Sequence, residues 1–400
     1  MGFVDKTPEG RYRAYFRDPA GKQRSKTFRT KRDASAFLAE IETAKTRGAY
    51  VSPHSGRVLF ADHAAQWMAT WNTEATTAAR DHSVMRTHVL PQWGSVQLAK
   101  IDHIGLQAWV TELGRQRSRA TVIEALRLTA AVLRSAVRNR LIPFNPAEEV
   151  RAPRSRVRDT DERIISRVDL RTRLLPAVPP RYRGIVATAG GAGLRWGEAA
   201  GLRADALDLD GARLSVIRTV VEVGGHTTFK PFPKSRAGRR TIPLPGWLVP
   251  VIRTHLDTWP TDGDGPIFAN EVGAPLRRTL FRSRIWRPSL VRAGLLGAVV
   301  QLGRREWEAQ WTDDDGVKHA ERLRTETAAV NHVARHQAGG LRFHDLRHSY
   351  ATWLVDDGVP ANMVQRVMGH ERSSTTLDLY TRRTDDGDRI LRALDDPDDD

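Results

Sequence analysis

The segment from residue 341 to residue 380 carries more polar side chains at helical spacing than a buried core needs. Its sequence, LRFHDLRHSYATWLVDDGVPANMVQRVMGHERSSTTLDLY, contains His344, Arg347, His370 and Tyr380. His344 and Arg347 are three residues apart, so a helix places both on one face. Glycine and proline residues within the segment break it into three short helices. We therefore expect one helical unit to aim these four side chains at a common point.

The combination of arginine, histidine and tyrosine suits chemistry at a phosphate. A guanidinium is planar, permanently charged and able to bind two phosphate oxygens at once. An imidazole donates to a phosphate oxygen or moves a proton near neutral pH. A tyrosine hydroxyl, whose reference pKa is roughly 10, becomes a nucleophile toward phosphorus in a field of fixed positive charge. The expected product is a phosphotyrosyl bond.

Each of these residues also has a structural explanation when it is taken alone. The HDLRH stretch is typical of a solvated helix face, His370 of a turn, and Tyr380 of a core aromatic with a hydrated hydroxyl. The ordered combination favours a functional site over these separate explanations.

The segment resembles the C-terminal half of the catalytic domain of tyrosine recombinases, the phage-integrase family. That family has a His-x-x-Arg box, a Leu/Met-Gly-His turn and a nucleophilic tyrosine inside a Ser/Thr-Thr-x-x-x-Tyr helix. The corresponding residues here are 344–347, 368–370 and 375–380. The resemblance implies that Tyr380 is the nucleophile of a DNA strand-cleaving enzyme.

Composition favours a nucleic-acid partner. The chain has 400 residues, which predicts two or three domains, and 63 Lys+Arg against 47 Asp+Glu give a formal charge of +16. Such an excess favours a polyanion, and the sequence has no long apolar run or signal peptide, so we expect DNA rather than a membrane. The absence of cysteine excludes disulfides, thiol chemistry and cysteine-ligated zinc. The expected location is the cytoplasm of a bacterial host, on the nucleoid.

Residues 1–55 form the first expected domain. Alternating residues before and after the turn at residues 18–21 predict a basic β-hairpin, and a helix that begins near Thr30 is expected to cover one face of a small sheet. The opposite face would be left to the arginines. The module resembles the arm-type DNA-binding domain of phage integrases, and the alternative is a small solvated domain. The expected DNA contacts are Arg11, Arg13, Arg17, Lys22, Arg24 and Lys26.

A helical domain is expected at residues 59–150, because apolar residues recur there at helical spacing and glycine and proline divide the region into four or five helices. Its place and size resemble the core-binding domain of tyrosine recombinases, although its composition alone indicates only a helical bundle. Residues 143–162, rich in proline and arginine, read as an interdomain linker. Such a linker either lies along the phosphate backbone or is simply exposed.

The catalytic domain is expected at residues 160–394, followed by an acidic tail at 395–400. The GGAGLRWGE stretch lacks the Lys-Ser/Thr ending of a P-loop, so a nucleotide site is not expected there. The family pattern Gly-Leu-Arg-x-x-Glu instead implies that Arg195 is the first active-site arginine and that Glu198 buttresses it. Arg195 alone would read equally well as a surface residue.

A lysine on a β-hairpin is the expected general acid. The family pattern Pro-Lys-Thr/Ser-x-x-x-Arg-Arg-x-Ile/Val-Pro-Leu places this lysine at Lys234, which would protonate the leaving 5′ oxygen. Lys230 is the competing choice, and lysines in a basic loop are commonly phosphate contacts.

The sequence departs from the family near residues 297–340, where an apparent insertion separates the motifs. The Asp313–Gly316 run between tryptophan-bearing flanks predicts a surface hairpin rather than a calcium loop. Residues 390–394 are expected to form a short helix that docks on a neighbouring protomer, as in the family.

We therefore expect a multidomain, mainly α protein: an N-terminal three-stranded sheet plus helix, a helical core-binding domain, and a mixed α+β tyrosine-recombinase catalytic domain. The resemblance implies a site-specific recombinase or integrase of a phage or mobile element that cuts and rejoins DNA through a 3′-phosphotyrosyl intermediate. Positive side chains would do the electrostatic work, so no cofactor and no metal is expected. Double-stranded DNA attachment sites, a homotetramer on DNA, and host DNA-bending and excision-directing factors are the implied partners.

Two other functions remain open from the sequence. A non-catalytic DNA-binding regulator accounts for the basic modules but not for the ordered catalytic set. A type IB topoisomerase-like enzyme shares the chemistry but has no use for an arm domain.

Overall fold

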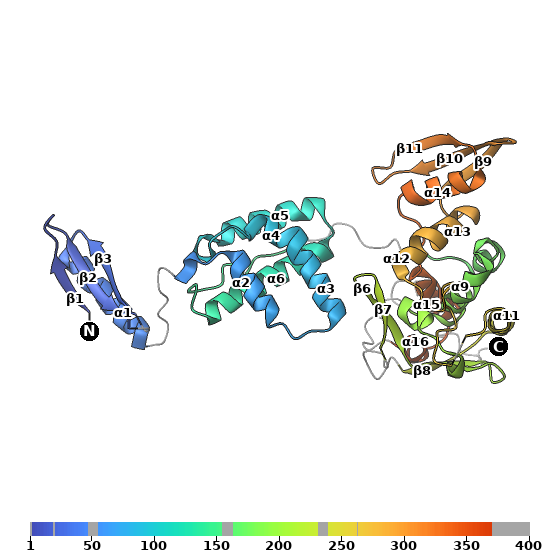
Figure 1. Ribbon diagram of the computed structural model, residues 1–400, viewed down its shortest axis with the longest axis horizontal. Coiled ribbons are helices and arrows are strands. Elements are labelled where there is room, and N and C mark those ends of the chain that lie inside the picture. The colour runs from blue at the N-terminus through green and yellow to red at the C-terminus, as the bar shows by residue number, and fades with distance from the viewer. Residues whose placement is uncertain are drawn as a thin grey trace, which may run out of the picture. The chain divides into compact units, whose positions relative to one another are not determined.

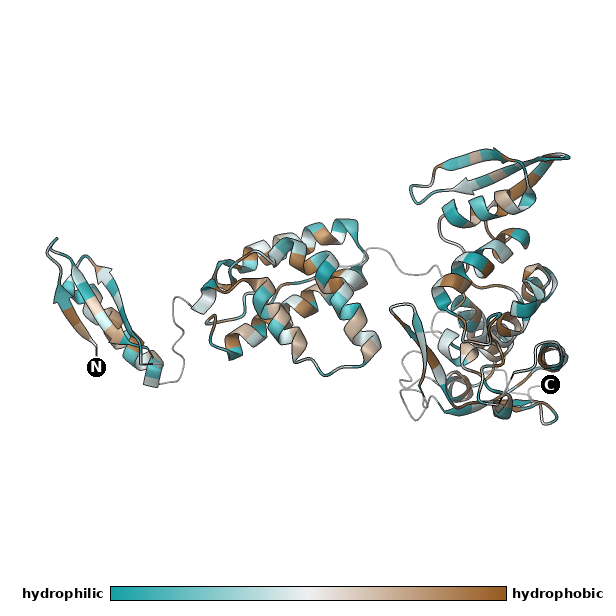
Figure 2. Cartoon of the chain, viewed as in Figure 1, coloured by the Kyte–Doolittle hydropathy of each residue, from teal (hydrophilic) through white to brown (hydrophobic). Residues whose placement is uncertain are grey.

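The structure is a computed structural model that describes residues 2–18, 21–46, 55–153, 163–230, 239–261 and 263–369. The chain divides into two compact units, Met1–Arg158 and Asp159–Asp400, whose elements are labelled in Figure 1. Helices in both units mix hydrophilic and hydrophobic residues (Figure 2). Among the described residues, none of the helices has the length and apolar character needed to cross a bilayer.

The N-terminal module is a three-stranded antiparallel sheet with one helix on it, as expected. Its strands run in the order β1-β2-β3. Ala14 and Phe16 on the middle strand point toward the helix and are buried, and Phe37 of the helix packs against Phe16. The elements are β1 (Phe3–Lys6), β2 (Tyr12–Arg17), β3 (Gln23–Phe28) and α1 (Lys31–Thr46).

The strand register puts the basic residues of this sheet on two faces. Arg13 and Arg17 alternate with the buried residues of β2 and lie on the open face. Arg24 is the cross-strand partner of Phe16, so it lies on the α1 side, where its Nε donates to Asp18 at 3.0 Å. The expectation that the arginines occupy the open face is wrong for Arg24. Its pairing with Phe16 places the Arg24 side chain on the same face of the sheet as that buried ring.

The other three expected DNA contacts lie on the α1 side of the sheet or in its turns. Lys26 also lies on the α1 side, with its Nζ 5.4 Å from the ring centre of Phe28 and 5.0 Å from that of Phe37. Arg11 and Lys22 are exposed in the two turns of the sheet. The open face therefore carries two of the six expected contacts.

The second part of the first unit is a helical bundle. The last helix carries an apolar stripe whose members Val122, Leu128 and Val132 are fully buried. Two helix starts are capped, with Asp102 accepting from the backbone of the first turn of α5 and Ser118 doing the same for α6. The helices are α2 (Phe60–Ala69), α3 (Ala75–Val84), α4 (Leu90–Trp93), α5 (His103–Gln116) and α6 (Arg119–Arg138), with a π-type turn (Met85–Val89) joining α3 to α4.

The first part of the expected linker packs on this bundle instead of being exposed. Ala147 and Val150 are buried in the bundle core. The Gln107 side chain accepts from the backbone N–H of Arg151 and donates to its carbonyl, both at 3.0 Å. The arginines at 154, 156 and 158 lie outside the described residues.

The second unit has one large apolar core, which includes Ile185, Leu214, Trp286 and Leu346. Around this core lie α7 (Arg167–Asp169), α8 (Leu175–Ala177), α9 (Pro180–Ala192), α10 (Trp196–Ala200), α11 (Leu248–Thr258), α12 (Arg278–Phe281), α13 (Arg287–Arg292), α15 (Asp345–Asp356) and α16 (Ala361–Met368). The π-type turns Leu170–Leu174 and Arg282–Trp286 join α7 to α8 and α12 to α13.

Two small sheets flank these helices. One has the order β4-β5-β8, and the other is the hairpin β6-β7, whose turn residues Gly224 and Gly225 have positive φ. The strands are β4 (Leu207–Asp208), β5 (Arg213–Val216), β6 (Thr219–Val223), β7 (His226–Lys230) and β8 (Arg240–Pro243).

The apparent insertion folds as a sheet with a helix against it. The antiparallel order is β11-β10-β9, and Ala309 of the middle strand is buried with Val330 and Val333 of the helix. The Asp313–Gly316 run forms the β10–β11 turn, as the sequence predicted, with Gly316 at φ 81°. The elements are β9 (Ala298–Gly303), β10 (Glu306–Thr312), β11 (Lys318–Leu323) and α14 (Glu326–His336).

Candidate active site

A left-handed turn brings Arg195 to its position. Helix α9 ends at Gly193, whose φ is 63°. A Cβ at Gly193 would lie 2.4 Å from Cδ1 of Tyr350, so no other residue fits without displacing that ring. Two residues later, Arg195 is the N-cap of α10. The glycine-rich stretch is therefore the turn that connects α9 to α10.

Glu198 fixes Arg195 through two contacts. Its Oε2 accepts from the backbone N–H of Arg195 at 2.8 Å, and its Oε1 accepts from Nη1 of the same residue at 2.9 Å. Glu198 itself is only 3% exposed. The Arg195 side chain, in contrast, is 41% exposed, so an incoming anion can reach it.

Arg240 is a further member of the site that the sequence reasoning did not single out. Its Nη1 and Nη2 donate to Oε1 and Oε2 of Glu198 at 3.0 and 2.9 Å, and its Nε donates to the Val367 carbonyl at 2.6 Å. One signal was present in the sequence, because Arg240 shares a strand face with Ile242, which is buried. An arginine at such a position needs a buried acidic partner.

Arg347 joins two distant segments of the unit. Residue 347 lies on α15 and is 2% exposed. Its Nη1 donates to the carbonyl of Gly193 at 2.6 Å, and its Nη2 donates to the carbonyl of Met368. Nη2 of Arg195 donates to the carbonyl of the next residue, Gly369, at 3.3 Å. The two arginines therefore hold the end of α16.

The cluster carries excess positive charge. Arg195, Arg240 and Arg347 surround the single carboxylate of Glu198. Burial by itself raises the pKa of Glu198, but the hydrogen bonds and charge of Arg240, with the charges of Arg195 and Arg347, outweigh it and lower this pKa to about 2. Burial and the neighbouring charge of Arg195 lower the pKa of Arg347 to about 9, so it stays cationic at neutral pH. The site therefore favours an anion.

His344 is the N-cap of α15 and is partly exposed. Partial burial lowers the pKa of His344 to about 4, and the charges of His348, Arg347 and Arg195 act in the same direction. The imidazole is consequently neutral at pH 7. A neutral ring can donate one hydrogen bond and accept a proton.

The structure brings together Arg195, Glu198 and Arg347, with His344 one turn from Arg347 on the same helix. Lys230, the alternative general acid, is the last residue of β7. Three expected site residues lie outside the described residues: Lys234, His370 and Tyr380. His370 directly follows Gly369, which Arg195 contacts.

Comparison with family models gives two matches. The model described as "Phage integrase family" matches residues 315–386, and the model described as "Phage integrase, N-terminal domain" matches residues 1–47. The first match covers α14, α15 and α16 with Arg347, and the second covers the N-terminal sheet and helix.

Two integrases have sequences similar to this chain over most of its length. A putative prophage phiRv2 integrase of Mycobacterium tuberculosis is 27% identical over 406 residues, covering 98% of this chain and 94% of the relative. An integrase of Streptomyces ambofaciens is 23% identical and covers 92% of this chain and 87% of its own length. A tyrosine recombinase XerC-like protein of Caldanaerobacter subterraneus is 27% identical over half of this chain and 45% of its own length.

Solved structures share the fold. A Tn1549 transposon integrase in complex with transposon right end DNA aligns with a TM-score of 0.61 at 16% identity, covering 84% of this chain and 99% of that one. A lambda integrase dimer bound to a core site aligns with a TM-score of 0.53 at 16% identity. The alignment covers 96% of this chain and 95% of the lambda integrase chain. Arg195, Arg347 and Glu198 lie together in the structure. Together with the family-model matches and the related integrases, this cluster identifies the chain as a tyrosine recombinase of the phage integrase family.

Proposed function

We propose that this recombinase cuts DNA with Tyr380 while Arg195 and Arg347 bind the scissile phosphate. The observation that supports this assignment most is the convergence of two guanidiniums, distant in the sequence, on the buried carboxylate of Glu198. The same guanidiniums contact the backbone of Met368 and Gly369, after which the sequence continues to His370 and Tyr380.

In the proposed reaction, the Tyr380 oxygen forms a bond to phosphorus and the bond to the 5′ oxygen breaks. The product is a 3′-phosphotyrosyl link and a free 5′ hydroxyl, whose proton comes from Lys234. Neutral His344 accepts the phenol proton, and the imidazolium so formed donates a hydrogen bond to a phosphate oxygen. Arg195, Arg347 and His370 stabilise the charge on the pentacoordinate phosphate. A second strand's 5′ hydroxyl reverses the step and rejoins the DNA.

The relatives support a role in moving a genetic element. Proteins of similar sequence or fold are described as a prophage integrase and a transposon integrase. A lambda integrase tetramer bound to a Holliday junction aligns with a TM-score of 0.50 at 15% identity. We propose that four protomers of this chain act on two duplex attachment sites in the bacterial cytoplasm, on the nucleoid, with host DNA-bending and excision-directing factors as partners.

A covalent trap tests the proposal. Duplexes that span both junctions of the element carrying the gene, each nicked close to the crossover, let the cleaved fragment diffuse away. We expect a protein–DNA adduct that survives denaturing electrophoresis, is absent in Tyr380→Phe, and persists in Tyr182→Phe as the matched control. Adduct formation that survives Tyr380→Phe overturns the assignment of the nucleophile, and loss of the adduct in a chelator overturns the metal-free mechanism.

Two further readouts separate the remaining functions. Joining of two different duplexes is expected for the recombinase, whereas loss of supercoils without joining indicates a topoisomerase-like enzyme. DNA binding without any adduct indicates a regulator.

A further inference from the structure

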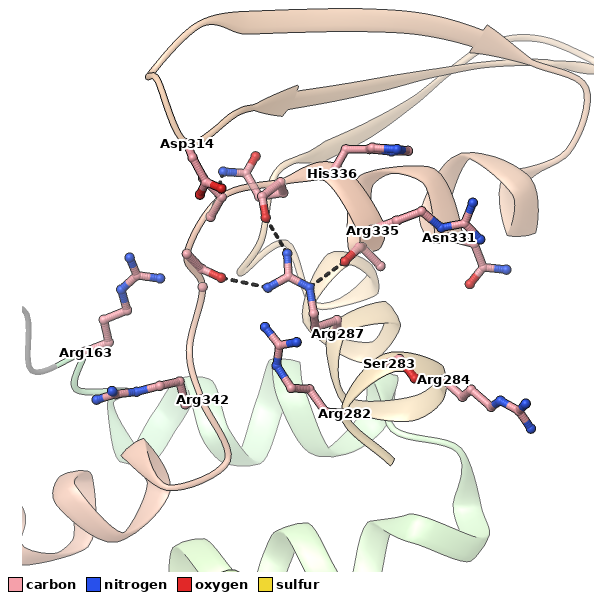
Figure 3. Close-up of a pocket in the computed structure, with 15 residues that line it drawn as sticks. Arg163, Arg282, Ser283, Arg284, Arg287, Asp314, Asn331, Arg335, His336 and Arg342 are labelled. Carbon is pink, nitrogen blue, oxygen red and sulfur yellow. Dashed lines mark hydrogen bonds between the residues drawn. The ribbon is translucent and has the colours of Figure 1, made fainter. Parts of the chain in front are cut away.

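A second basic site lies between the insertion and the helices α12 and α13. A cavity of about 1000 Å³ is lined there by six arginines and one aspartate. Figure 3 shows Arg282 beside Arg287, with Arg163 and Arg342 together on one flank. The aspartate is Asp314 of the β10–β11 turn. The arginines are Arg163, Arg282, Arg284, Arg287, Arg335 and Arg342. We call this cavity the arginine pocket.

Arg287 forms the floor of the arginine pocket. It is 8% exposed, and its three guanidinium nitrogens donate to the carbonyls of Ala334, Gln337 and Gly339. These neutral acceptors fix the side chain without cancelling its charge. A buried guanidinium ordinarily has a carboxylate partner. Within the described part of the chain Arg287 has no such partner, so its charge is available to an anion.

The other arginines leave the pocket's charge largely uncompensated. Among the described residues, no carboxylate lies within ion-pair distance of Arg163, Arg282, Arg284 or Arg335. Arg342 is the exception, because it pairs with Asp345 at 2.8 Å. Several like charges held together in one cavity repel one another unless an anion binds there. Arginine forks match phosphate oxygens in particular.

The arginine pocket adjoins a second cavity that reaches residues of the candidate active site. This cavity, of about 330 Å³, shares Arg282, Arg287 and Arg342 with the pocket and is also lined by Trp196 and His344. Trp196 follows Arg195 directly in the sequence, and His344 is two residues after Arg342. Phosphates repeat along a DNA strand, so a strand that places one phosphate at Arg195 can extend its neighbouring phosphates toward the pocket.

We propose that the arginine pocket binds backbone phosphates of the DNA duplex beside the scissile phosphate, and that the insertion completes this contact. Residues 331 and 334–340 of the pocket belong to the insertion, as does Asp314. The inference rests on the proposed function, because it takes DNA as the polyanion. Contacts of this kind carry no sequence information, so they add affinity and fix the position of the duplex.

Salt-dependent DNA binding tests the pocket. The double variant Arg163→Gln/Arg282→Gln removes two exposed guanidiniums that make no bond to the rest of the described protein, so it is expected to fold, which thermal unfolding checks. Binding of the full chain to a fluorescent 30-base-pair duplex of arbitrary sequence is measured by anisotropy across a range of salt. Each phosphate contact contributes about 0.9 to the slope of log K against log salt. The slope of the double variant is expected to be smaller by about 2 than that of the wild type.

The matched control is Arg292→Gln, which removes an exposed arginine of α13 that does not line the pocket. Its slope is expected to stay at the wild-type value. An unchanged slope in the double variant, or an equal loss per charge in the control, overturns the proposal. A small phosphate ligand is tested with inorganic pyrophosphate. The proposal is also overturned if pyrophosphate raises the unfolding temperature of the wild type but not of the double variant, while the two proteins have the same salt slope for DNA binding. That result would assign the pocket to a small phosphate ligand.

The two proposals fail in different ways. If the pocket proposal is wrong, the Tyr380-dependent adduct still forms while the slopes are equal. If the proposed function is wrong, no adduct forms with any junction duplex, whatever the slopes show.

Discussion

Glu198 and Arg240 form a buried two-point ion pair, with both carboxylate oxygens within 3.0 Å of guanidinium nitrogens. The pair connects α10 to β8, and the same carboxylate orients Arg195. The site's charge is therefore arranged by one acid that three basic side chains share.

Removal of Arg240 is expected to destabilise the second unit. Arg240→Ala leaves the Glu198 carboxylate buried beside weaker partners, and breaking such a pair costs about 3–5 kcal/mol. Arg253→Ala removes an exposed partner of Asp210 and is expected to cost less than about 1 kcal/mol. Urea unfolding followed by tryptophan fluorescence measures both, and equal losses in the two variants would contradict the structural role given to Arg240.

Acid is expected to weaken the same unit through Glu198. Its pKa of about 2 lies below the ordinary 4.5, so its contribution to stability is complete above pH 4.5 and is lost as the pH falls toward 2. The shift corresponds to about 3 kcal/mol. Between pH 4.5 and 2.5, Glu198→Gln should show a flatter decline in the free energy of unfolding than either the wild type or the exposed control Glu271→Gln. A decline as steep as that of the wild type would show that Glu198 does not titrate as described.

The imidazole of His344 is expected to remain neutral well below pH 6. In a carbon–proton correlation spectrum of histidine-labelled protein, the resonance missing from His344→Gln should titrate near pH 4. A midpoint near 6.5 would mean that the neighbouring arginines do not act on the ring.

Arg347→Lys is expected to lower the rate of adduct formation by about a hundredfold or more, because an ammonium lacks the fork that spans two acceptors. Arg366→Lys changes an exposed arginine on α16 and should leave the rate unchanged. Equal rates in the wild type and Arg347→Lys would show that Arg347 does not act on the phosphate.

Gly193→Ala and Gly224→Ala together separate the cost of backbone strain from the cost of overpacking a side chain, because the two glycines have similar φ angles. Both glycines have positive φ, 63° and 57°, but an added Cβ meets the Tyr350 ring only at Gly193 and open space at Gly224. Backbone strain costs about 1 kcal/mol in each, and overpacking adds about 1–3 kcal/mol at Gly193. Similar unfolding free energies for the two variants would show that the ring moves aside without cost.

Sequence patterns predicted the elements that depend on local chemistry. Alternation and turn residues indicated the N-terminal strands, and the Asp313–Gly316 run indicated its hairpin. The family motifs pointed to Arg195, Glu198 and Arg347, which lie together. The roles of Lys234, His370 and Tyr380 stay predictions.

Features that depend on long-range register were not predictable from local patterns. The face on which Arg24 lies depends on its pairing with Phe16 across the hairpin. The acidic partner of Arg240 comes from a helix far away in the sequence. The arginine pocket depends on how the insertion packs against α13, which no single segment encodes.

The hydrogen bonds from Arg195 and Arg347 to the carbonyls of Gly369 and Met368 make the end of α16 a competitor for the donors that a phosphate needs. Anchoring of this helix and recognition of the substrate are thus energetically coupled. Substitutions at the two arginines will not be additive, and only a double-mutant cycle can separate the coupling energy from the loss of each contact.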